Sequence, residues 1–442
     1  MARALAKTWI ATGTFAAGLG SVLTASAASS GPESAMRELA ERNERLEAQV
    51  RDQRELIDRL AAEVAAMRDA TERQERALRS LAGLADAGAP ERGASRQEAA
   101  VRITGEAGLA FFRTGATGQF PNSEFRVDDA KVAIEARVWK NAYVFAEFDL
   151  LSREANDPSF QLGEFYADFE DVARDRLLNV RVGRMNIPFG EEYQRRRVMT
   201  NPLISHSLGD LWGIDEGIEA YGEAGRFSYV VAVQNGGHSL LRDYTSDKSV
   251  TARVGYDPHR SVHLSASAMR TGDLPTRNDT LSELWFGGGF FRALGPAATT
   301  TAFNARLYEL DAVGRWRTGH VAAAAGWVRF DDDDTTADNA RRLDYHFVEA
   351  LQKLGDKLHA AARYSTIRAP EGYPLAGWGQ LGTYFFGGLL TQRLERLSVG
   401  FAYHFGPPLV LKFEYTRETG RFAGGAARPS EDVIATEVGL KF

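Results

Sequence analysis

The sequence contains no cysteine, and after residue 32 it contains no long hydrophobic run. The lack of cysteine excludes disulfides, thiolate metal sites and cysteine catalysis. A transmembrane helix needs about 20 consecutive apolar residues, so a protein built from several membrane helices is excluded. The strands of a transmembrane barrel alternate between lipid-facing and lumen-facing residues, so their average hydropathy is ordinary. The sequence therefore does not exclude a transmembrane β-barrel.

Recognisable catalytic signatures are also lacking. The sequence has no G-x-S-x-G, H-E-x-x-H or G-x-x-x-x-G-K-[ST] motif, and its eight histidines do not have the spacing of metal ligands. The formal net charge is −6, and only eight of the 53 lysines and arginines are lysines. We therefore expect a protein that is not an enzyme and that binds no cofactor, metal or nucleic acid.

The first 27 residues have the features of a secretory signal peptide. Arg3 and Lys7 give a positively charged start, residues 9–23 are apolar, and Ala25 and Ala27 form an A-x-A cleavage site. An uncleaved anchor helix is the alternative, but the glycines within the apolar segment argue against it. We expect this segment to be removed during export.

A heptad repeat occupies residues 33–82. Its a and d positions run without interruption from Met36 to Leu81, which indicates a coiled coil. At 1.5 Å per residue, such a helix is about 70 Å long. A single charged surface helix is the alternative, and residues 83–100 form a linker rich in alanine, glycine and charge. The predicted apolar seam residues are Leu39, Leu46, Val50, Ile57, Leu60, Val64, Met67, Leu78 and Leu81.

From residue 101 to residue 442, the hydrophobic period changes to two. Leu411 and Phe413, for example, alternate with Lys412 and Glu414. About sixteen segments have one apolar face and one polar face in this way. Strands of this kind belong either to a water-soluble sandwich or to a membrane barrel whose apolar face meets lipid.

Short and long connections alternate along the same region. Short connections such as 140–141 and 404–408 alternate with long connections such as 184–213 and 271–300. A transmembrane barrel has short periplasmic turns and long outer loops, whereas a soluble sandwich has no reason to sort its connections. We therefore predict an all-β transmembrane barrel of about sixteen antiparallel strands over 101–442, preceded by the α-helical coiled coil.

The long connection 184–213 is rich in arginine. It contains Arg184 and the triplet Arg195, Arg196 and Arg197. A loop folded into the barrel would set the constriction, where guanidinium groups attract anions and bind phosphate oxygens in pairs. The alternative is a surface loop whose arginines bind lipid phosphates or pair with nearby glutamates. We predict a constriction in which these four arginines bind anions.

Three short motifs resemble landmarks of the phosphate-selective porin O and P family. They are VGRMNIPFGE at 182–191, GIDEG at 213–217 and VQNG at 233–236, in the order of that family. The resemblance implies a sixteen-stranded trimeric barrel that passes anions, with arginines in an infolded loop and basic residues along the lumen. The family's role for basic residues can be assigned to Arg184 because Arg184 lies within a matching motif. It can be assigned to the arginine triplet only because the triplet lies at a similar position.

The charge of the barrel region departs from the pattern of that family. Residues 101–442 contain 39 basic and 44 acidic residues. Net charge does not decide the selectivity of a pore, because the charge at the constriction does. The predicted basic residues that line the lumen are Lys131, Arg137, Arg181, Arg253, Arg363 and Lys412.

Together these features predict a porin in the outer membrane of a Gram-negative-type cell, with the coiled coil in the periplasm. We expect passive diffusion of small hydrophilic solutes, with anions such as phosphate favoured. The expected assembly is a homotrimer surrounded by outer-membrane lipid and lipopolysaccharide. The alternative function is a structural anchor whose coiled coil tethers the barrel to peptidoglycan.

Overall fold

The structure is a computed structural model that describes the barrel region and leaves out the N-terminal hundred residues. The predicted signal peptide (1–27), coiled coil (33–82) and linker (83–100) therefore lie outside the described residues and stay predictions. No helix among the described residues is long and apolar enough to cross a membrane. The described residues are 101–151, 161–173, 176–211, 213–236, 246–276, 287–294, 299–379, 389–429 and 431–442.

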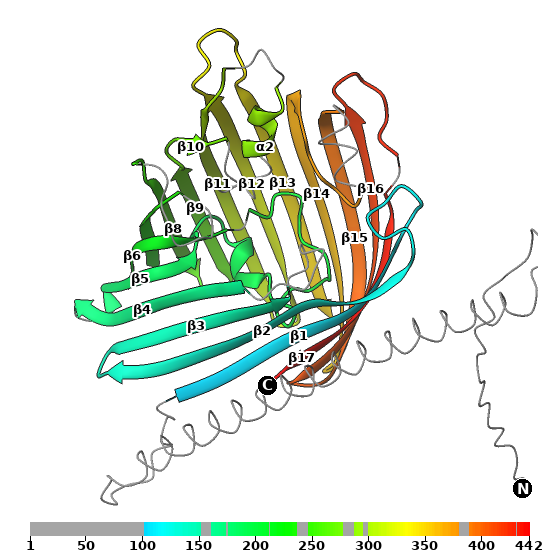
Figure 1. Cartoon of the computed structure of the whole chain (residues 1–442). Coiled ribbons are helices and arrows are strands. Elements are labelled where there is room, and N and C mark those ends of the chain that lie inside the picture. The colour runs from blue at the N-terminus through cyan, green and yellow to red at the C-terminus, as the bar shows by residue number, and fades with distance from the viewer. Residues whose placement is uncertain are drawn as a thin grey trace, which may run out of the picture. The chain divides into compact units, whose positions relative to one another are not determined.

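Within the described residues, sixteen long strands form one antiparallel sheet that closes on itself (Figure 1). A two-residue strand, β10 (Leu274–Pro275), pairs with the start of β11, and the short helices are η2 (Glu192–Arg195) and α2 (Gly287–Arg292). The long strands are β1 (Val101–Thr114), β2 (Glu124–Trp139), β3 (Ala142–Leu151), β4 (Gln161–Ala173), β5 (Leu178–Asn186), β6 (Ile214–Ala224), β7 (Phe227–Gln234), β8 (Ser249–His259), β9 (Val262–Arg270), β11 (Ala302–Trp316), β12 (Gly319–Asp332), β13 (Arg341–Lys353), β14 (Leu358–Tyr373), β15 (Thr391–Gly406), β16 (Leu409–Phe422) and β17 (Val433–Lys441).

The first and last strands complete the ring. Ala107 of β1 is the partner of Leu440 of β17, and the backbone N–H groups of Gly105 and Phe442 each donate to the carbonyl of the other, at 3.1 and 2.9 Å. The prediction of a closed sixteen-stranded antiparallel barrel is therefore confirmed. The alternative of two stacked sheets is wrong, because every long strand has a neighbour on both sides.

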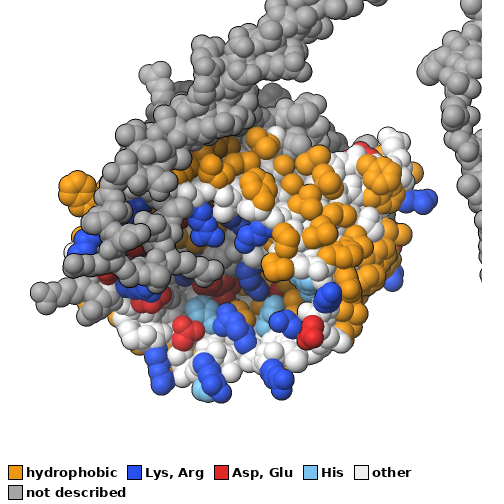
Figure 2. Space-filling view, turned by 90° about the horizontal axis from the view of Figure 1, so that it is seen from below, with side chains coloured by type: hydrophobic (Ala, Val, Ile, Leu, Met, Phe, Trp, Pro, Cys, Tyr) orange, Lys and Arg blue, Asp and Glu red, His pale blue; other side chains and the backbone are white. Residues whose placement is uncertain are grey.

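The two faces of the strands differ as their sequences predict. On β16, Leu411 and Tyr415 are exposed on the outside, whereas Lys412 and Glu414 are buried on the inside. Figure 2 shows the barrel from its short-turn end, with hydrophobic side chains over the outer surface and charged side chains around a hollow. Short turns lie at this end and long loops at the other, as the alternation of connection lengths predicts.

Near the long-loop end, the inner face of β11 to β14 is apolar instead of polar. Phe290 and Phe291 of α2 pack there against Tyr373 and Phe303, with ring centroids 5.1 and 5.3 Å apart, and Phe330 stacks on Tyr373. Aromatic rings buried in this way gain stability from apolar burial and from their edge and offset contacts. This part of the barrel interior is therefore a packed core, which the alternation of the sequence did not predict.

Candidate functional site

The connection between β5 and β6 folds into the barrel. We call residues 187–213 the inner loop; its two ends meet where the Ile187 N–H donates to the Gly213 carbonyl at 2.8 Å. Most of its described side chains are buried, and they contact the inner faces of strands on both sides of the barrel. A loop on the outer surface would instead leave most of these side chains exposed.

The motif Pro188-Phe189-Gly190 directs the chain from β5 into the interior. Gly190 has a positive φ of 69°, which a residue without a Cβ adopts at little cost. Its N–H donates to Ser267 Oγ of β9 at 3.1 Å, and its carbonyl accepts from Arg253 of β8 at 2.6 Å. A Cβ at this position would collide with the Glu309 carboxylate of β11. The beginning of the inner loop is thus fixed against β8, β9 and β11.

The far side of the inner loop is held by β16. The Glu414 carboxylate accepts hydrogen bonds from the backbone N–H groups of Ile204 and Ser205, at 2.6 and 2.8 Å. The Lys412 ammonium donates to the Leu203 carbonyl at 3.1 Å. These charge-assisted bonds satisfy backbone groups that the loop would otherwise bury without partners.

Arg363 of β14 and Arg396 of β15 hold neighbouring carbonyls of the same loop. Arg363 donates to the Ser205 carbonyl at 2.7 Å and to Asn201 Oδ1 at 2.9 Å, and Arg396 donates to the His206 carbonyl at 3.0 Å. The predicted lumen residues Arg363 and Lys412 therefore face inward, but they are buried. Their observed contacts anchor the inner loop.

Each arginine of the triplet in the inner loop has a carboxylate partner. Two of these partners lie on the barrel wall and the third lies in the loop itself. The positive charge of the triplet is therefore balanced, which sequence spacing did not predict. The ion pairs are Arg195–Glu349 at 3.3 Å, Arg196–Asp210 at 2.6 Å and Arg197–Glu147 at 2.9 Å.

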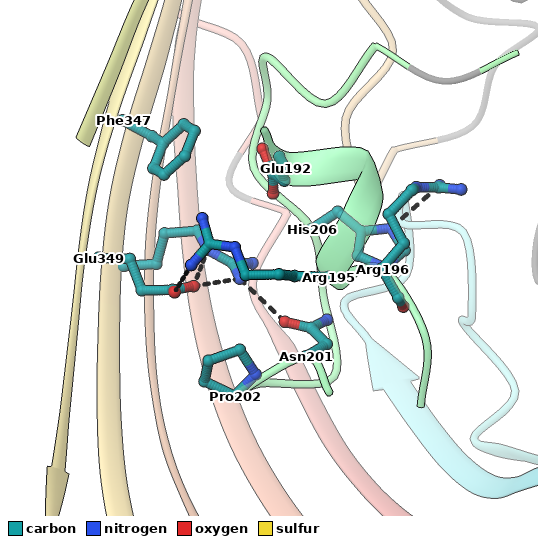
Figure 3. A pocket seen from close by; sticks show the side chains of 9 residues that line it. Glu192, Arg195, Arg196, Asn201, Pro202, His206, Phe347 and Glu349 are labelled. Atoms are coloured by element: carbon teal, nitrogen blue, oxygen red, sulfur yellow. Dashed lines mark hydrogen bonds and ion pairs between the residues drawn. The ribbon is translucent and has the colours of Figure 1, made fainter. Parts of the chain in front are cut away.

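In the two ion pairs that join the inner loop to the barrel wall, the arginine and the glutamate differ in exposure. The Arg197 side chain is 45% exposed while Glu147 is 4% exposed, and the corresponding values for Arg195 and Glu349 are 29% and 2%. In Figure 3 the Glu349 side chain extends from the wall toward Arg195 of the inner loop. Arg363 of β14 also pairs with Glu349. The cavity among these side chains has a volume of about 10 Å³, room for about one water molecule. The guanidinium groups, and not the carboxylates, therefore meet the solvent.

A larger cavity of about 480 Å³ lies between the inner loop and the wall from β4 to β8, on the short-turn side. Arg181 lines it, with its guanidinium 4.3 Å from the ring centre of Tyr166 and 5.0 Å from that of Tyr221. Ion pairs of 3.0 Å join Arg181 to Asp168 and to Glu219. The cavity wall is thus polar and aromatic, with its charges paired.

Arg253 and Tyr193 form the boundary between this cavity and the inner loop. The Arg253 guanidinium lies 5.4 Å from the ring centre of Tyr193 and pairs with Glu191 at 3.4 Å. Burial raises the pKa of the Tyr193 phenol above its usual value, so the phenol is neutral at physiological pH. Arg181 and Arg253 are therefore the two predicted lumen residues that border the larger cavity.

Lys131 and Arg137 of β2 have different surroundings. The Lys131 ammonium lies 3.8 Å from Glu147 and 3.6 Å from Asp149, so it belongs to the same charge network as Arg197. Arg137 is exposed at the turn to β3, where it donates to the carbonyls of Trp139 and Lys140 at 3.3 and 2.6 Å. Arg137 therefore stabilises a short turn at the rim.

The expectation that Arg184 lines the constriction needs correction. Its Cα partners are Phe165 and Glu216, and this row faces outward like the exposed pair Val182–Ile218 beside it. The Arg184 guanidinium donates to two carbonyls of β4 at 3.0 and 3.2 Å and pairs with Glu216 at 2.8 Å. A shift of one residue along a strand reverses the face, so Arg184 lies apart from the arginine triplet.

Sequence reasoning missed the pairings of the carboxylates that complete the site. Glu147 and Glu414 stand on strand faces that alternation assigns to the lumen, but nothing in the local sequence names their partners. Glu192 is also buried and accepts from the Ser207 N–H at 2.9 Å within the inner loop. The available signal was the excess of acidic residues in the barrel region, which indicates that the arginines are compensated.

Comparison with known proteins identifies the fold. No family model and no curated protein matches the chain. The outer membrane channel DcaP of Acinetobacter baumannii is 10% identical, with a TM-score of 0.54 over 77% of this chain and 97% of that chain. The anion-selective porin from Comamonas acidovorans is 10% identical, with a TM-score of 0.53 over 77% of this chain and 99% of that chain.

The in-vitro folded, trimeric form of OmpT, an outer membrane protein of Vibrio cholerae, is also similar. It is 11% identical, with a TM-score of 0.52 over 77% of this chain and 99% of that chain. At these identities the likeness concerns the fold. The described barrel is therefore similar in fold to solved outer-membrane channels and porins.

Proposed function

We propose that this protein is an outer-membrane porin that lets small hydrophilic solutes diffuse passively through its barrel. The observation that carries the proposal is a closed barrel, apolar outside and charged inside, with an inner loop fixed across its interior. Such an outer surface suits lipid, and such an interior suits water. Diffusion through it needs no cofactor and no covalent step.

Anions such as phosphate are the favoured solutes in this proposal. Arg195 and Arg197 present exposed guanidinium groups to the interior, whereas Glu349 and Glu147 lie buried behind them. An ion passing the inner loop therefore meets the positive member of each pair first, and selectivity follows the charge at the narrowest level. Because every arginine of the triplet is paired, we expect a moderate preference for anions instead of a tight phosphate site.

A homotrimer in the outer membrane is the proposed assembly, in keeping with the solved trimeric form of OmpT, a protein of similar fold. The predicted periplasmic coiled coil would join the three copies at one side of the membrane. The alternative prediction, a coil that tethers the barrel to peptidoglycan, depends on residues outside the described part of the chain. Purified peptidoglycan in a pull-down with the full-length protein would separate the two.

Reversal potentials across planar bilayers test the proposed solute preference. We expect the wild-type channel to favour anions in a tenfold salt gradient. The double variant Arg195→Gln/Arg197→Gln should move the reversal potential toward cation preference, because two exposed positive charges are removed while Glu147 and Glu349 stay.

The matched control is Arg306→Gln/Arg329→Gln, which removes two positive charges from the outer surface of β11 and β12. It should leave the reversal potential unchanged. A wild-type channel that prefers cations, or a loop variant indistinguishable from wild type, would refute the anion preference. The absence of any conductance from correctly folded protein would refute the porin itself.

A further inference from the structure

Seven arginines form a row on the outside of the barrel, at the long-loop end of β9 and of β11 to β16. Side chains alternate between the two faces of a strand, and the residues next to these arginines, such as Leu307 and Phe330, are buried on the inner face. The arginines therefore face outward. Strand register places four of them directly beside one another and the other three directly beside one another. We call the two sets together the arginine row: Arg270, Arg306, Arg329 and Arg342, then Arg368, Arg393 and Arg421.

The arginine row has more positive charge than the described residues neutralise. Directly opposed side chains on one face of a sheet have Cβ atoms about 5 Å apart, and like charges there are destabilising. Arg329 pairs with Asp331 at 3.5 Å, and Arg393 pairs with Glu395. The other five arginines have no ion pair to any described residue, even though Asp344 is the Cα partner of Arg368.

Aromatic residues mark the level of the arginine row. One outward position below Arg306 and Arg329 lie Tyr308 and Trp327, which are partners and are both exposed. Below them the outer surface of β11 is apolar down to the exposed Trp316 at the short-turn end. Aromatic girdles flank an apolar band about 25 Å tall at the two interfaces of a membrane, so the row stands at headgroup level.

The row is confined to one side of the barrel. At the long-loop ends of β2, β3, β7 and β8, the outward positions hold the exposed hydrophobic residues Phe125, Leu150, Val233 and Val250. Outside the wall from β9 to β16, Arg184 on the outer face is compensated by Glu216, and Arg113 of β1 is exposed beside Ile434 of β17. Among the described residues, a continuous row of arginines therefore lies only on the wall from β9 to β16.

We propose that the arginine row binds the phosphate groups of phosphorylated glycolipid, such as lipopolysaccharide, in the outer leaflet. Guanidinium groups bind phosphate oxygens in pairs, and the acyl chains would lie along the apolar band that begins at Tyr308 and Trp327. Strands about 4.8 Å apart give the row a length of roughly 30 Å, enough for several headgroups. This proposal rests on the proposed outer-membrane location, but not on solute transport.

The phosphates would replace the missing acidic partners of the row. Lipid phosphates repel one another and are ordinarily bridged by divalent cations. A guanidinium supplies the same positive charge from the protein, so we expect lipid bound at the row to stay bound when divalent cations are chelated. This property distinguishes the row from a surface that binds lipid through bridging cations.

Lipid binding to the full-length protein in non-ionic detergent tests the proposal. Diphosphorylated lipid A is titrated in the presence of EDTA, and native mass spectrometry reports bound lipid. We expect Arg306→Gln/Arg329→Gln to bind about 10- to 30-fold more weakly than wild type. Arg306→Lys/Arg329→Lys should lie between the two, since it keeps the charge but loses paired hydrogen bonding.

The matched control is Arg260→Gln/Arg317→Gln, which removes two exposed arginines from the short-turn end and should bind as wild type does. Unchanged single-channel conductance shows that each variant is folded, because the row lies outside the pore. Equal binding by wild type and the Arg306/Arg329 variant would overturn the proposal. The proposal would also be overturned if dephosphorylated lipid bound as tightly as diphosphorylated lipid A. The same holds if inorganic phosphate, at the same concentration of phosphorus, displaced the bound lipid. A protein that binds lipid at the row but conducts no ions would overturn the porin proposal alone.

Discussion

The wall from β11 to β16 and the wall from β3 to β9 differ in height and in contents. Strands of the first wall have 13 to 16 residues, and strands of the second have 8 to 13. We call them the tall wall and the low wall; Figure 1 shows both. The tall wall carries the apolar core, the anchors of residues 203–206 of the inner loop and most of the arginine row. The low wall borders the larger cavity.

This difference indicates that the firmly held part of the interior and the open part of the interior lie beside different walls. On the tall wall, the buried side chains of Arg363 and Lys412 pair with Glu349 and Glu437 and donate hydrogen bonds to the carbonyls of Ser205 and Leu203, which fixes this part of the inner loop. Beside the low wall, Arg181 and Arg253 border open space. We therefore propose that the larger cavity beside the low wall is part of the path of solutes. The following substitutions compare the two walls directly.

The largest effect is expected from Arg363→Met on the tall wall. The substitution leaves Glu349 buried without its closest partner, and breaking a buried ion pair costs about 3 to 5 kcal/mol. We expect that loss in the free energy of unfolding, together with altered conductance as the inner loop detaches. Urea titration in lipid and single-channel recording measure the two effects.

The counterpart on the low wall is Arg181→Met. Its partners Asp168 and Glu219 stand beside the 480 Å³ cavity, where water can hydrate them. We expect the free energy of unfolding to fall by only about 1 kcal/mol. Equal losses for the two variants would show that the walls do not differ in this respect.

An effect smaller than that of Arg363→Met but larger than that of Arg181→Met is expected from Gly190→Ala at the beginning of the inner loop. An alanine at this position is strained by the positive φ, and its Cβ collides with the Glu309 carboxylate. We therefore expect the free energy of unfolding to fall by about 2 to 3 kcal/mol. Gly225 in the turn from β6 to β7 has a similar φ of 64° but open space around it, so Gly225→Ala should cost about 1 kcal/mol. Thermal unfolding of both variants gives the difference, which measures the crowding at Gly190 alone.

The smallest effect on stability, below about 0.5 kcal/mol, is expected from Ser228→Trp on the low wall. Ser228 lines the larger cavity, so the indole would fill part of it and reduce single-channel conductance about twofold. Val231 stands on the same strand and faces outward, so Val231→Trp should leave conductance unchanged. An unchanged conductance for Ser228→Trp would mean that ions pass elsewhere in the barrel.

Alternation along single strands was sufficient to predict the barrel and its two faces. The faces of β16 follow from Leu411, Lys412, Phe413 and Glu414, because a period of two depends only on neighbours in sequence. Around Leu307 the alternation of apolar and polar residues is weak, since the inward residues are apolar where they meet the packed core near α2. Tertiary packing hid the pattern there.

The candidate site was less predictable, because it depends on register and on pairs distant in sequence. Arg184 was assigned to the lumen, but one residue decides the face of a strand. Arg195 and Glu349 are 154 positions apart, and no local pattern joins them. The arginine row is equally invisible in the sequence, since its members become neighbours only when the strands align.

The seam between β1 and β17 has a consequence for how the chain folds. Its partners Ala107 and Leu440 are 333 residues apart, so β1 must wait for almost the whole barrel before it gains its second neighbour. Until then both edges of the growing sheet offer unpaired N–H and C=O groups to any other strand. Assembly therefore needs either a companion that covers these edges, or a membrane in which closure is faster than aggregation.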